Sequence, residues 1–471
     1  MLERGMLPDF SPAALAELRH VRVAATTDGQ QASDLRDLLW TSVDNDDSLD
    51  LDQLTVAEKT PDGRTKVLVA VADVDVLVKK GKAIDEHAGQ NTTSVYTAAQ
   101  VFPMLPERLS TGLTSLNQGE ERLSVVVELV VNADGSFDDS GLLRARVRNR
   151  AKLAYNSVAA WLEGTRPEPG AITAVRGLAE NLRLQDEVAQ IMKAFRQANG
   201  ALTLETTHAL AVFEGDNITD LRQERRNRAK DIITGFMIAA NSVTARYLSA
   251  RQSPSIRRVV RAPERWNRIV QLAAEHKFGL PADPDPRSLE EFLTAAKAAD
   301  PLRFPDLSLA VIKLLGPGEY VAEFPGDAAP GHFGLAVKDY GHSTAPNRRY
   351  TDLVTQRLLK AALEGRPSPY GPEELTVLAA RCTEKEDAAN KVERQVNKSA
   401  AALFLQAKIG EEFDAIITGV GDRGTWLRLV TPPVDGKLVQ GSEGVDVGDR
   451  VRARLTSVDV ERGFIDFARA E

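Results

Sequence analysis

The chain has 471 residues, of which 43% are apolar and 27% are charged, an ordinary composition for a globular protein of two or three domains. The lone Cys382 excludes an internal disulfide and a cysteine-based zinc site, and no apolar run is long enough to cross a bilayer, so we expect a soluble cytoplasmic protein without a membrane partner. The net charge of −8 argues against a nucleic-acid partner unless the cations are gathered in one place.

The first 35 residues contain one short helical segment, residues 11–21, and too little apolar sequence for a core of their own. We interpret residues 1–35 as a lead-in to a larger domain over residues 36–405. That domain begins with strand-like runs. Two of them flank TPDGR, whose Pro-Asp-Gly is a turn signal, and they predict a hairpin over residues 54–74.

Just before this hairpin, the segment TSVDNDDSLDLDQL crowds five aspartates into nine positions. Carboxylates this close repel one another, so a folded site must neutralise them, and a divalent cation with oxygen ligands does so best. In an extended stretch Asp50 and Asp52 point to the same side, roughly 7 Å apart. Together with Asp44 they would hold one or two Mg²⁺ ions for phosphodiester hydrolysis.

The acidic segment has two alternative interpretations besides a Mg²⁺ site. A calcium-binding EF-hand loop would need Gly where Leu49 stands and Glu where Thr55 stands, and its flanks would be helices rather than strands. A solvated acidic loop is the other alternative. The interleaved Leu49, Leu51 and Leu54 argue against it, because they indicate that part of the segment is buried.

Cations gather in four clusters in spite of the acidic total. Five of them recur at period two in LLRARVRNRAK, which places them on one face of a strand: Arg144, Arg146, Arg148, Arg150 and Lys152. The others lie at residues 222–230, at residues 251–265 and at Arg348 with Arg349. Any single cluster is compatible with a scattered surface, but four together favour a basic groove for nucleic acid.

Helical apolar spacing follows the arginine strand and is clearest at residues 233–247 and 389–403. After residue 407, about five short strands separated by turns predict a small closed barrel such as an OB-fold over residues 407–471. The barrel contains three large aromatic side chains, Phe413, Trp426 and Phe464. We interpret them as barrel core, with stacking platforms for single-stranded nucleic acid as the alternative.

Several blocks of the chain resemble the bacterial ribonuclease II and ribonuclease R family. In the family's order they are VDNDDSLDLDQL, VLVAVADVDVLVKKGKAIDEHA, TSVYTAAQVFPMLPERLSTGLTSLNQGEERL and FGLAVKDYGHSTAPNRRYTDLVTQRLLKAAL. The resemblance implies an α+β RNB catalytic domain, with mixed strands and helices around an RNA channel, followed by an S1-type RNA-binding barrel. It also implies processive hydrolysis of single-stranded RNA from the 3′ end to 5′-mononucleotides, with Mg²⁺ at the cleaved phosphate and Mn²⁺ as an open alternative.

Residue by residue, the resemblance places Asp44, Asp50 and Asp52 on the first three aspartates of the family's metal motif. Tyr96 falls on the aromatic that stacks against the terminal nucleotide, although a lone strand aromatic is more often core. Glu393 falls on a glutamate near the same end of the RNA, with an exposed helix charge as the alternative.

Arg348 and Arg349 follow the segment STAPN, which suits the start of a helix. Helix N-termini attract phosphate, and a guanidinium there offsets the charge that develops during cleavage. We therefore expect Asp52, Tyr96, Arg348 and Glu393 to be catalytic. Separately, we expect four side chains to contact RNA: Tyr96, Arg348, Arg349 and Trp426.

The chain departs from the family pattern in three places. The family's metal motif ends in two adjacent aspartates, whereas Gln53 follows Asp52 here, and its amide oxygen would be an uncharged ligand. The usual pair of N-terminal cold-shock barrels is not expected within the 35 lead-in residues. The second aromatic of the nucleotide clamp has Phe213 as its only candidate ring in HALAVFEGDN.

Two functions from different classes remain. The favoured one is a Mg²⁺-dependent 3′-to-5′ exoribonuclease that acts as a monomer on single-stranded RNA or on structured RNA with or without a 3′ overhang. The alternative is a catalytically inactive RNA-binding protein of the same fold, silenced by Gln53. The joint presence of Asp44, Asp50, Asp52, Tyr96 and Arg348 favours the enzyme.

Overall fold

The computed structural model of the protein describes residues 1–25, 32–206, 209–214, 217–223, 226–328, 330–421 and 424–470, without the side chains of 138–140, 209, 210, 213, 214, 217, 222 and 223. Phe213, the candidate second clamp aromatic, therefore lies outside the described side chains. Among the described residues, no helix is both long enough and apolar enough to cross a membrane.

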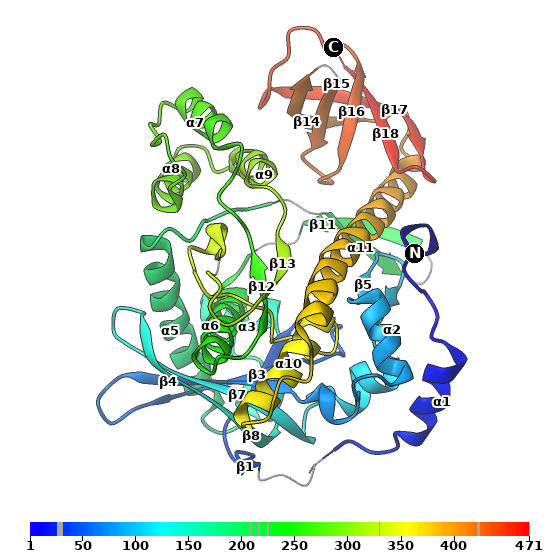
Figure 1. Ribbon diagram of the computed structural model, residues 1–471. Coiled ribbons are helices and arrows are strands. Elements are labelled where there is room, and N and C mark those ends of the chain that lie inside the picture. The colour runs from blue at the N-terminus through cyan, green and yellow to red at the C-terminus, as the bar shows by residue number, and fades with distance from the viewer. Residues whose placement is uncertain are drawn as a thin grey trace.

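A seven-stranded mixed sheet forms the base of the larger domain (Figure 1). In spatial order its strands are β1 (Ser33–Asp34), β8 (Phe137–Arg148), β7 (Glu121–Val131), β4 (Thr65–Ala72), β3 (Gln53–Lys59), β2 (Thr41–Asp44) and β9 (Ala151–Ala154). The β1–β8 and β2–β9 pairs are parallel and the others are antiparallel. The predicted hairpin is confirmed as β3–β4, with Lys59 opposite Thr65.

Both faces of this sheet are buried. On β4, Leu68 and Ala70 belong to one hydrophobic core, whereas Val67 and Val69 belong to a second core on the opposite face. Successive side chains of a strand point to opposite faces, so a strand buried on both sides is apolar throughout, as the run VLVAVA is. Helices α2, α10 and α11 contribute to the first core, and α3, α5 and α6 contribute to the second.

Eleven α-helices lie within the described residues, and apolar spacing predicted two of them. They are α1 (Pro12–His20), α2 (Ala83–Asn91), α3 (Tyr155–Leu162), α4 (Gly170–Thr173), α5 (Leu178–Ala198), α6 (Arg228–Ala250), α7 (Trp266–Glu275), α8 (Pro286–Ala299), α9 (Phe304–Leu315), α10 (Tyr350–Leu363) and α11 (Pro372–Gln406). The predicted lead-in helix is confirmed as α1, which begins where the Ser11 hydroxyl accepts the backbone N–H of Ala14. The stripes at 233–247 and 389–403 lie within α6 and α11.

The long helix α11 runs from beside the sheet to the C-terminal barrel (Figure 1). The barrel is closed in the order β14 (Glu412–Gly421), β15 (Gly424–Leu429), β16 (Asp435–Gln440), β18 (Phe464–Arg469) and β17 (Arg450–Asp459). Three two-stranded sheets complete the strands: β5 (Val95–Tyr96) with β6 (Val101–Phe102), β10 (Ala209–Glu214) with β11 (Asn217–Gln223), and β12 (Ser255–Val259) with β13 (Glu319–Glu323). The predicted five-stranded barrel and the α+β class are thus confirmed.

The interpretation of the barrel aromatics as core is wrong for two of the three. Trp426 and Phe464 are 38% and 57% exposed, whereas Phe413 is partly buried against the barrel core. The buried ring of the last strand is Phe467, three residues beyond Phe464. Alternation along β18 places the two rings on opposite faces, so the exposed face of the barrel carries aromatic surface.

The arginine strand is also not a free row of cations. Strand β8 ends at Arg148, and Lys152 lies on β9 instead. Each of the four arginines contacts a carboxylate: Arg144 contacts Asp73, Arg146 contacts Asp34, Arg148 contacts Glu121 and Arg150 contacts Asp37. Their charge is therefore largely matched within the protein, which removes the main support for a basic groove on this strand.

Candidate active site

The acidic segment forms an irregular loop between β2 and β3 rather than the extended stretch that was predicted. Its last part is held by backbone contacts. The Ser115 hydroxyl accepts the N–H of Leu51 at 2.9 Å, and the carbonyl of Leu51 accepts the N–H of Leu116 at 3.0 Å. Asp46 and Asp47 lie exposed at the turn of the loop, whereas Asp52 is only 2% exposed. The loop thus turns its last carboxylate inward.

Asp52 is held by the start of α10. Its Oδ1 accepts the backbone N–H of Asn347 at 3.0 Å, and its Oδ2 accepts Nε–H of Arg348 at 3.1 Å. The helix begins two residues later, at Tyr350, as the STAPN segment predicts. The Arg348 side chain remains 41% exposed. Arg348 therefore combines a buried carboxylate partner with a solvent-facing guanidinium, which is suited to meeting a phosphate.

Tyr96 and Glu393 lie at the same site although they are 297 positions apart in the chain. The Tyr96 hydroxyl donates to Oδ2 of Asp50 at 2.6 Å, and the Tyr96 backbone N–H donates to Oε1 of Glu393 at 2.8 Å. Tyr96 is 39% exposed, so its ring is not the core aromatic of the alternative interpretation. Ser94 donates its N–H to the carbonyl of Arg348 at 3.0 Å, which fixes the tyrosine segment beside the arginine segment.

Asp44 completes the acidic group, and Gln53 lies against it. The Gln53 side-chain amide donates from Nε2 to Oδ1 of Asp44 at 3.4 Å, so its nitrogen rather than its oxygen faces the carboxylate. The other carboxylate oxygen of Asp44, Oδ2, is buried without a hydrogen-bond partner among the described residues. Burying a carboxylate oxygen without a partner is energetically unfavourable, and a cation bound to Asp44 would remove this cost.

The electrostatics of the site are dominated by burial. Burial raises the pKa of Asp52 to about 7, although Arg348 acts to lower it, and the nearby Asp50 adds to the rise. The pKa of Asp44 is likewise raised to about 7, first by burial and then by Asp50, against the effect of Arg348. Burial also raises the pKa of the Glu393 carboxyl and of the Tyr96 hydroxyl above their ordinary values. The positive charge of Arg348 therefore does not offset the effect of burial on the pKa values of Asp44 and Asp52.

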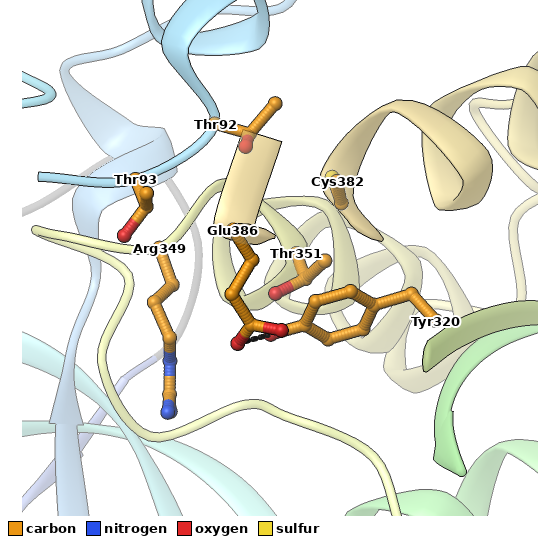
Figure 2. Close-up of a pocket in the computed structure, with 7 residues that line it drawn as sticks. All are labelled: Thr92, Thr93, Tyr320, Arg349, Thr351, Cys382 and Glu386. Carbon is orange, nitrogen blue, oxygen red and sulfur yellow. Dashed lines mark hydrogen bonds between the residues drawn. The ribbon is translucent and has the colours of Figure 1, made fainter. Parts of the chain in front are cut away.

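Arg349 forms its ion pair with Asp352 rather than with an aspartate of the acidic loop. Its guanidinium donates to both carboxylate oxygens of Asp352, at 2.9 Å from Nε and 2.7 Å from Nη2. Figure 2 shows Arg349 at a small cavity of about 20 Å³ that is also lined by Cys382 and by Glu386, which accepts the hydroxyl of Tyr320. This cavity is too small for a nucleotide. The predicted RNA contact of Arg349 stays a prediction, and its observed contact secures the first turn of α10.

Sequence reasoning missed the backbone N–H of Asn347 and the hydroxyl of Ser115, which position Asp52 and the acidic loop. Asn347 had a detectable signal, because the residues before a helix offer unpaired N–H groups to an anion. Ser115 had none, since it lies 64 positions from its partner Leu51. The fourth predicted RNA contact, Trp426, lies on the barrel, where its exposure leaves the ring available for stacking.

Carboxylates of the acidic loop thus lie beside an exposed arginine and an exposed tyrosine, and the C-terminal β-barrel carries exposed aromatic side chains. The description "RNB domain" matches residues 32–365, and "RNase II-type exonuclease C-terminal S1 domain" matches residues 411–470. The chain belongs to the RNB family, as the resemblance predicts. The limits of 36–405 and 407–471 that were predicted for the two domains stay predictions.

Known proteins resemble the chain over most of its length. Ribonuclease R of Escherichia coli (strain K12) is 30% identical over 472 residues, which cover 92% of this chain and 57% of the relative. The chain thus spans little more than half the length of that relative. Mycoplasma genitalium RNase R in complex with ribose methylated single-stranded RNA has a TM-score of 0.87 at 22% identity, covering 100% of this chain and 77% of that one. Yeast Ssd1, described as a pseudonuclease, has a TM-score of 0.69 at 16% identity, covering 90% and 52%.

RNB-family exonucleases depend on a metal ion, and the residues of this site fit one. The fit rests on the unpartnered Oδ2 of Asp44 and on an acidic donor set of the type that hard divalent cations prefer. Within the described part of the chain, no group of three or more His, Cys, Asp or Glu side chains is already arranged to hold a metal. In this structure Arg348 and Tyr96 bind two of the carboxylates instead. Each of these two contacts uses one carboxylate oxygen, Oδ2 of Asp52 for Arg348 and Oδ2 of Asp50 for Tyr96.

Proposed function

We propose that the chain is a processive 3′-to-5′ exoribonuclease that hydrolyses single-stranded RNA to 5′-mononucleotides. The observation that carries the proposal is the convergence of Asp52, Arg348, Tyr96 and Glu393, from four distant parts of the chain, on one acidic loop. Membership of the RNB family and similarity to proteins named ribonuclease R support it. The fold is similar to that of a protein described in complex with ribose methylated single-stranded RNA, which supports RNA as the substrate.

In the proposed reaction, side chains of the protein position the RNA and stabilise the negative charge that develops during cleavage. The exposed ring of Tyr96 stacks on the terminal base, and its hydroxyl holds Asp50 in place. Glu393 fixes the tyrosine backbone, so the distance from the stacked base to the acidic loop is set by rigid elements. The guanidinium of Arg348 pairs with the scissile phosphate and offsets the negative charge that develops as the bond to the leaving oxygen breaks.

A divalent cation, Mg²⁺ or Mn²⁺, would be held by Asp44, Asp50 and Asp52, and Gln53 would join them only after its amide turns its oxygen inward. When bound, such an ion activates water and stabilises the leaving oxygen. The raised pKa values of Asp44 and Asp52 fit this role, because a cation supplies the positive charge that the buried carboxylates lack.

A second candidate is an inactive RNA-binding protein. It is favoured by Gln53, which brings no charge and whose amide nitrogen faces Asp44. The exposed Trp426 and Phe464 of the barrel would serve either function, because stacking on bases does not depend on hydrolysis. The similarity of fold to a yeast pseudonuclease is compatible with this candidate.

The deciding experiment is digestion of a 5′-labelled single-stranded RNA with Mg²⁺ or Mn²⁺ by the native chain, Asp52→Asn, Gln53→Asp and the control Asp46→Asn, which alters an exposed carboxylate of the same loop. We expect the native chain and the control to shorten the RNA from its 3′ end and to release mononucleotides, and Asp52→Asn to do neither. Intact RNA with the native chain, together with cleavage by Gln53→Asp, would establish the inactive binding protein instead.

A further inference from the structure

A second cavity lies away from the acidic loop, between the two long helices α5 and α6. Its volume is about 310 Å³. The turn between β7 and β8 closes one side, and the segment Val337–Asp339 closes another. Ligand pockets start at about this size and are mostly apolar, with a few polar groups that orient the ligand. This cavity has that character, since Phe137, Met192 and Phe195 line it beside charged side chains.

The charged side chains of the cavity are mainly cationic. Arg196 comes from α5, Arg246 from α6 and Lys338 from the closing segment. Among the described side chains that line the cavity, the carboxylate is that of Asp339, which interacts with Arg246 and lies 3.6 Å from Arg257. The charge of Asp231 acts to raise the pKa of Arg196, but Asp231 forms its ion pair with Lys193, at 2.8 Å. The local carboxylates therefore already have other cations as partners.

Two polar groups of the cavity are buried without a partner. Nη1 of Arg196 and the hydroxyl of Ser242 have no hydrogen bond to any described residue. Burial also lowers the pKa of Arg196 and of Arg246 below the ordinary arginine value. A buried guanidinium nitrogen without an acceptor is energetically unfavourable, and a bound anion would supply the missing acceptor.

Arg246 and Lys338 lie at the exposed part of the cavity, whereas Ser242 is buried within it. The guanidinium of Arg246 lies 5.0 Å from the ring centroid of Phe137. An anion bound between Arg196 and Arg246 would contact two guanidinium groups and the hydroxyl of Ser242. The apolar wall of the cavity would pack against a flat uncharged ring attached to that anion. A phosphate attached to a nucleoside combines these two properties.

We propose that the cavity between α5 and α6 binds a nucleoside 5′-monophosphate, with its phosphate at Arg196, Arg246 and Ser242 and its base against Phe137 and Phe195. The choice of a mononucleotide rests on the proposed function, because 5′-mononucleotides are its product. One segment, residues 337–349, links the cavity to the candidate active site. Residues 337–339 line the cavity, and Arg348 contacts Asp52 of the active site. A bound product would thus contact the segment that positions the catalytic arginine.

Calorimetric titration of the full chain with AMP, in EDTA, tests the site. The titration uses the Arg348→Met variant as its background, so that binding at the candidate active site is weakened. In this background Arg196→Met is compared with Arg268→Met, an exposed arginine of α7 outside the cavity. We expect AMP to bind, Arg196→Met to weaken it by about 10-fold or more and the control to leave it unchanged. Arg246→Met, at the exposed part of the cavity, replaces Arg196→Met if that variant does not fold.

Adenosine, inorganic phosphate and a 5′-phosphorylated oligoribonucleotide complete the test. The proposal requires AMP to bind more tightly than either of its parts. It is overturned if AMP does not bind, if Arg196→Met and Arg246→Met have no effect, or if only the oligonucleotide shows the Arg196 dependence, because the cavity would then serve an RNA chain. RNA digestion by the native chain is measured separately, so AMP binding without digestion would refute the exoribonuclease and keep this site.

Discussion

Two groups of aspartates lie near α10, and their charges are compensated to very different degrees. At the candidate active site, among the described residues, the ion pair of Asp44, Asp50 and Asp52 is that between Asp52 and Arg348. In the second group, Asp73, Asp75 and Asp85 form ion pairs with three cations, Arg144, Arg357 and Lys360. Both groups are rich in carboxylates, so the number of acids alone does not tell them apart.

The second group is an internally paired network. Lys360 contacts Asp73 and Asp75 at 2.9 Å each, and Arg357 contacts Asp75 at 2.9 Å and Asp85 at 2.8 Å. Burial raises the pKa of Asp75, but Lys360 and Arg357 outweigh it and leave that pKa below the ordinary value. At the active-site loop the balance is reversed, and two carboxyls have pKa values of about 7. Unmatched buried charge therefore distinguishes the functional group from the structural one.

The largest expected effect breaks the paired network. Arg357→Met removes one cation and leaves Asp75 and Asp85 with less compensation, which costs about 3–5 kcal/mol of unfolding free energy for a buried pair. Urea unfolding measures it. The control is Arg366→Met, which removes an exposed arginine that forms an ion pair with Glu364. We expect it to change the free energy of unfolding by less than about 0.5 kcal/mol. A loss below about 1 kcal/mol in Arg357→Met would mean that the network is not what stabilises this region.

The matching change in the active-site group is Asp52→Asn. Because burial already disfavours the charged carboxyl, we expect the metal-free variant to be as stable as the native chain or about 1 kcal/mol more stable. Hydrolysis of RNA is expected to fall on the order of 100-fold or more, since a ligand of the proposed metal is lost. Urea unfolding and initial rates are measured on the same preparation. A clear loss of stability would place Asp52 with the structural aspartates.

The pH dependence of stability should separate the two groups by sign. The pKa values of Asp44 and Asp52 are higher in the folded state than their ordinary value of 3.8, so their contribution is complete below about pH 4 and is lost as the pH rises to about 7. The pKa of Asp75 is lowered, so its contribution is present above pH 4 and is lost on acidification.

For the metal-free chain we expect a fall of several kcal/mol between pH 4 and 7, since each of the two pKa values rises from 3.8 to about 7 and one unit corresponds to about 1.4 kcal/mol. Thermal unfolding in EDTA across this range measures it. Asp52→Asn should flatten the neutral side of the profile, and Asp75→Asn should flatten the acid side. A native profile that rises from pH 4 to 7 would contradict the assignment of the two raised pKa values.

The smallest expected effect sharpens the role of Gln53. Gln53→Asp adds a carboxylate beside Asp44, so we expect Mg²⁺ or Mn²⁺ to bind about 10-fold more tightly and the metal-free chain to become less stable. Calorimetric titration with each ion gives the affinity. The opposite change, tighter binding by Gln53→Leu, would exclude Gln53 from the site altogether.

Local patterns in the chain were enough to predict the elements that depend on neighbouring residues. The turn TPDGR sets the β3–β4 hairpin, Ser11 begins α1, and the apolar spacing of residues 233–247 and 389–403 predicts helices that the structure contains. The resemblance to the ribonuclease II and ribonuclease R family selected Asp44, Asp50, Asp52, Tyr96 and Arg348, which the fold brings to one place. These features are local because hydrogen-bonding turns, caps and side-chain periodicity involve residues only a few positions apart.

Partner choice was decided only by the tertiary structure. Period two places arginines on one face of β8, but whether they face RNA or carboxylates depends on Asp34, Asp73 and Glu121, which are distant in the chain. The same holds for Phe464 and Phe467, of which one is exposed and the other buried according to how the barrel closes. By itself, the sequence determined the β3–β4 hairpin, the helices at residues 233–247 and 389–403, the C-terminal barrel and the position of the acidic motif in the chain. Which charges are matched and which remain free was decided by long-range packing, since an ion pair depends on distance in space and not along the chain.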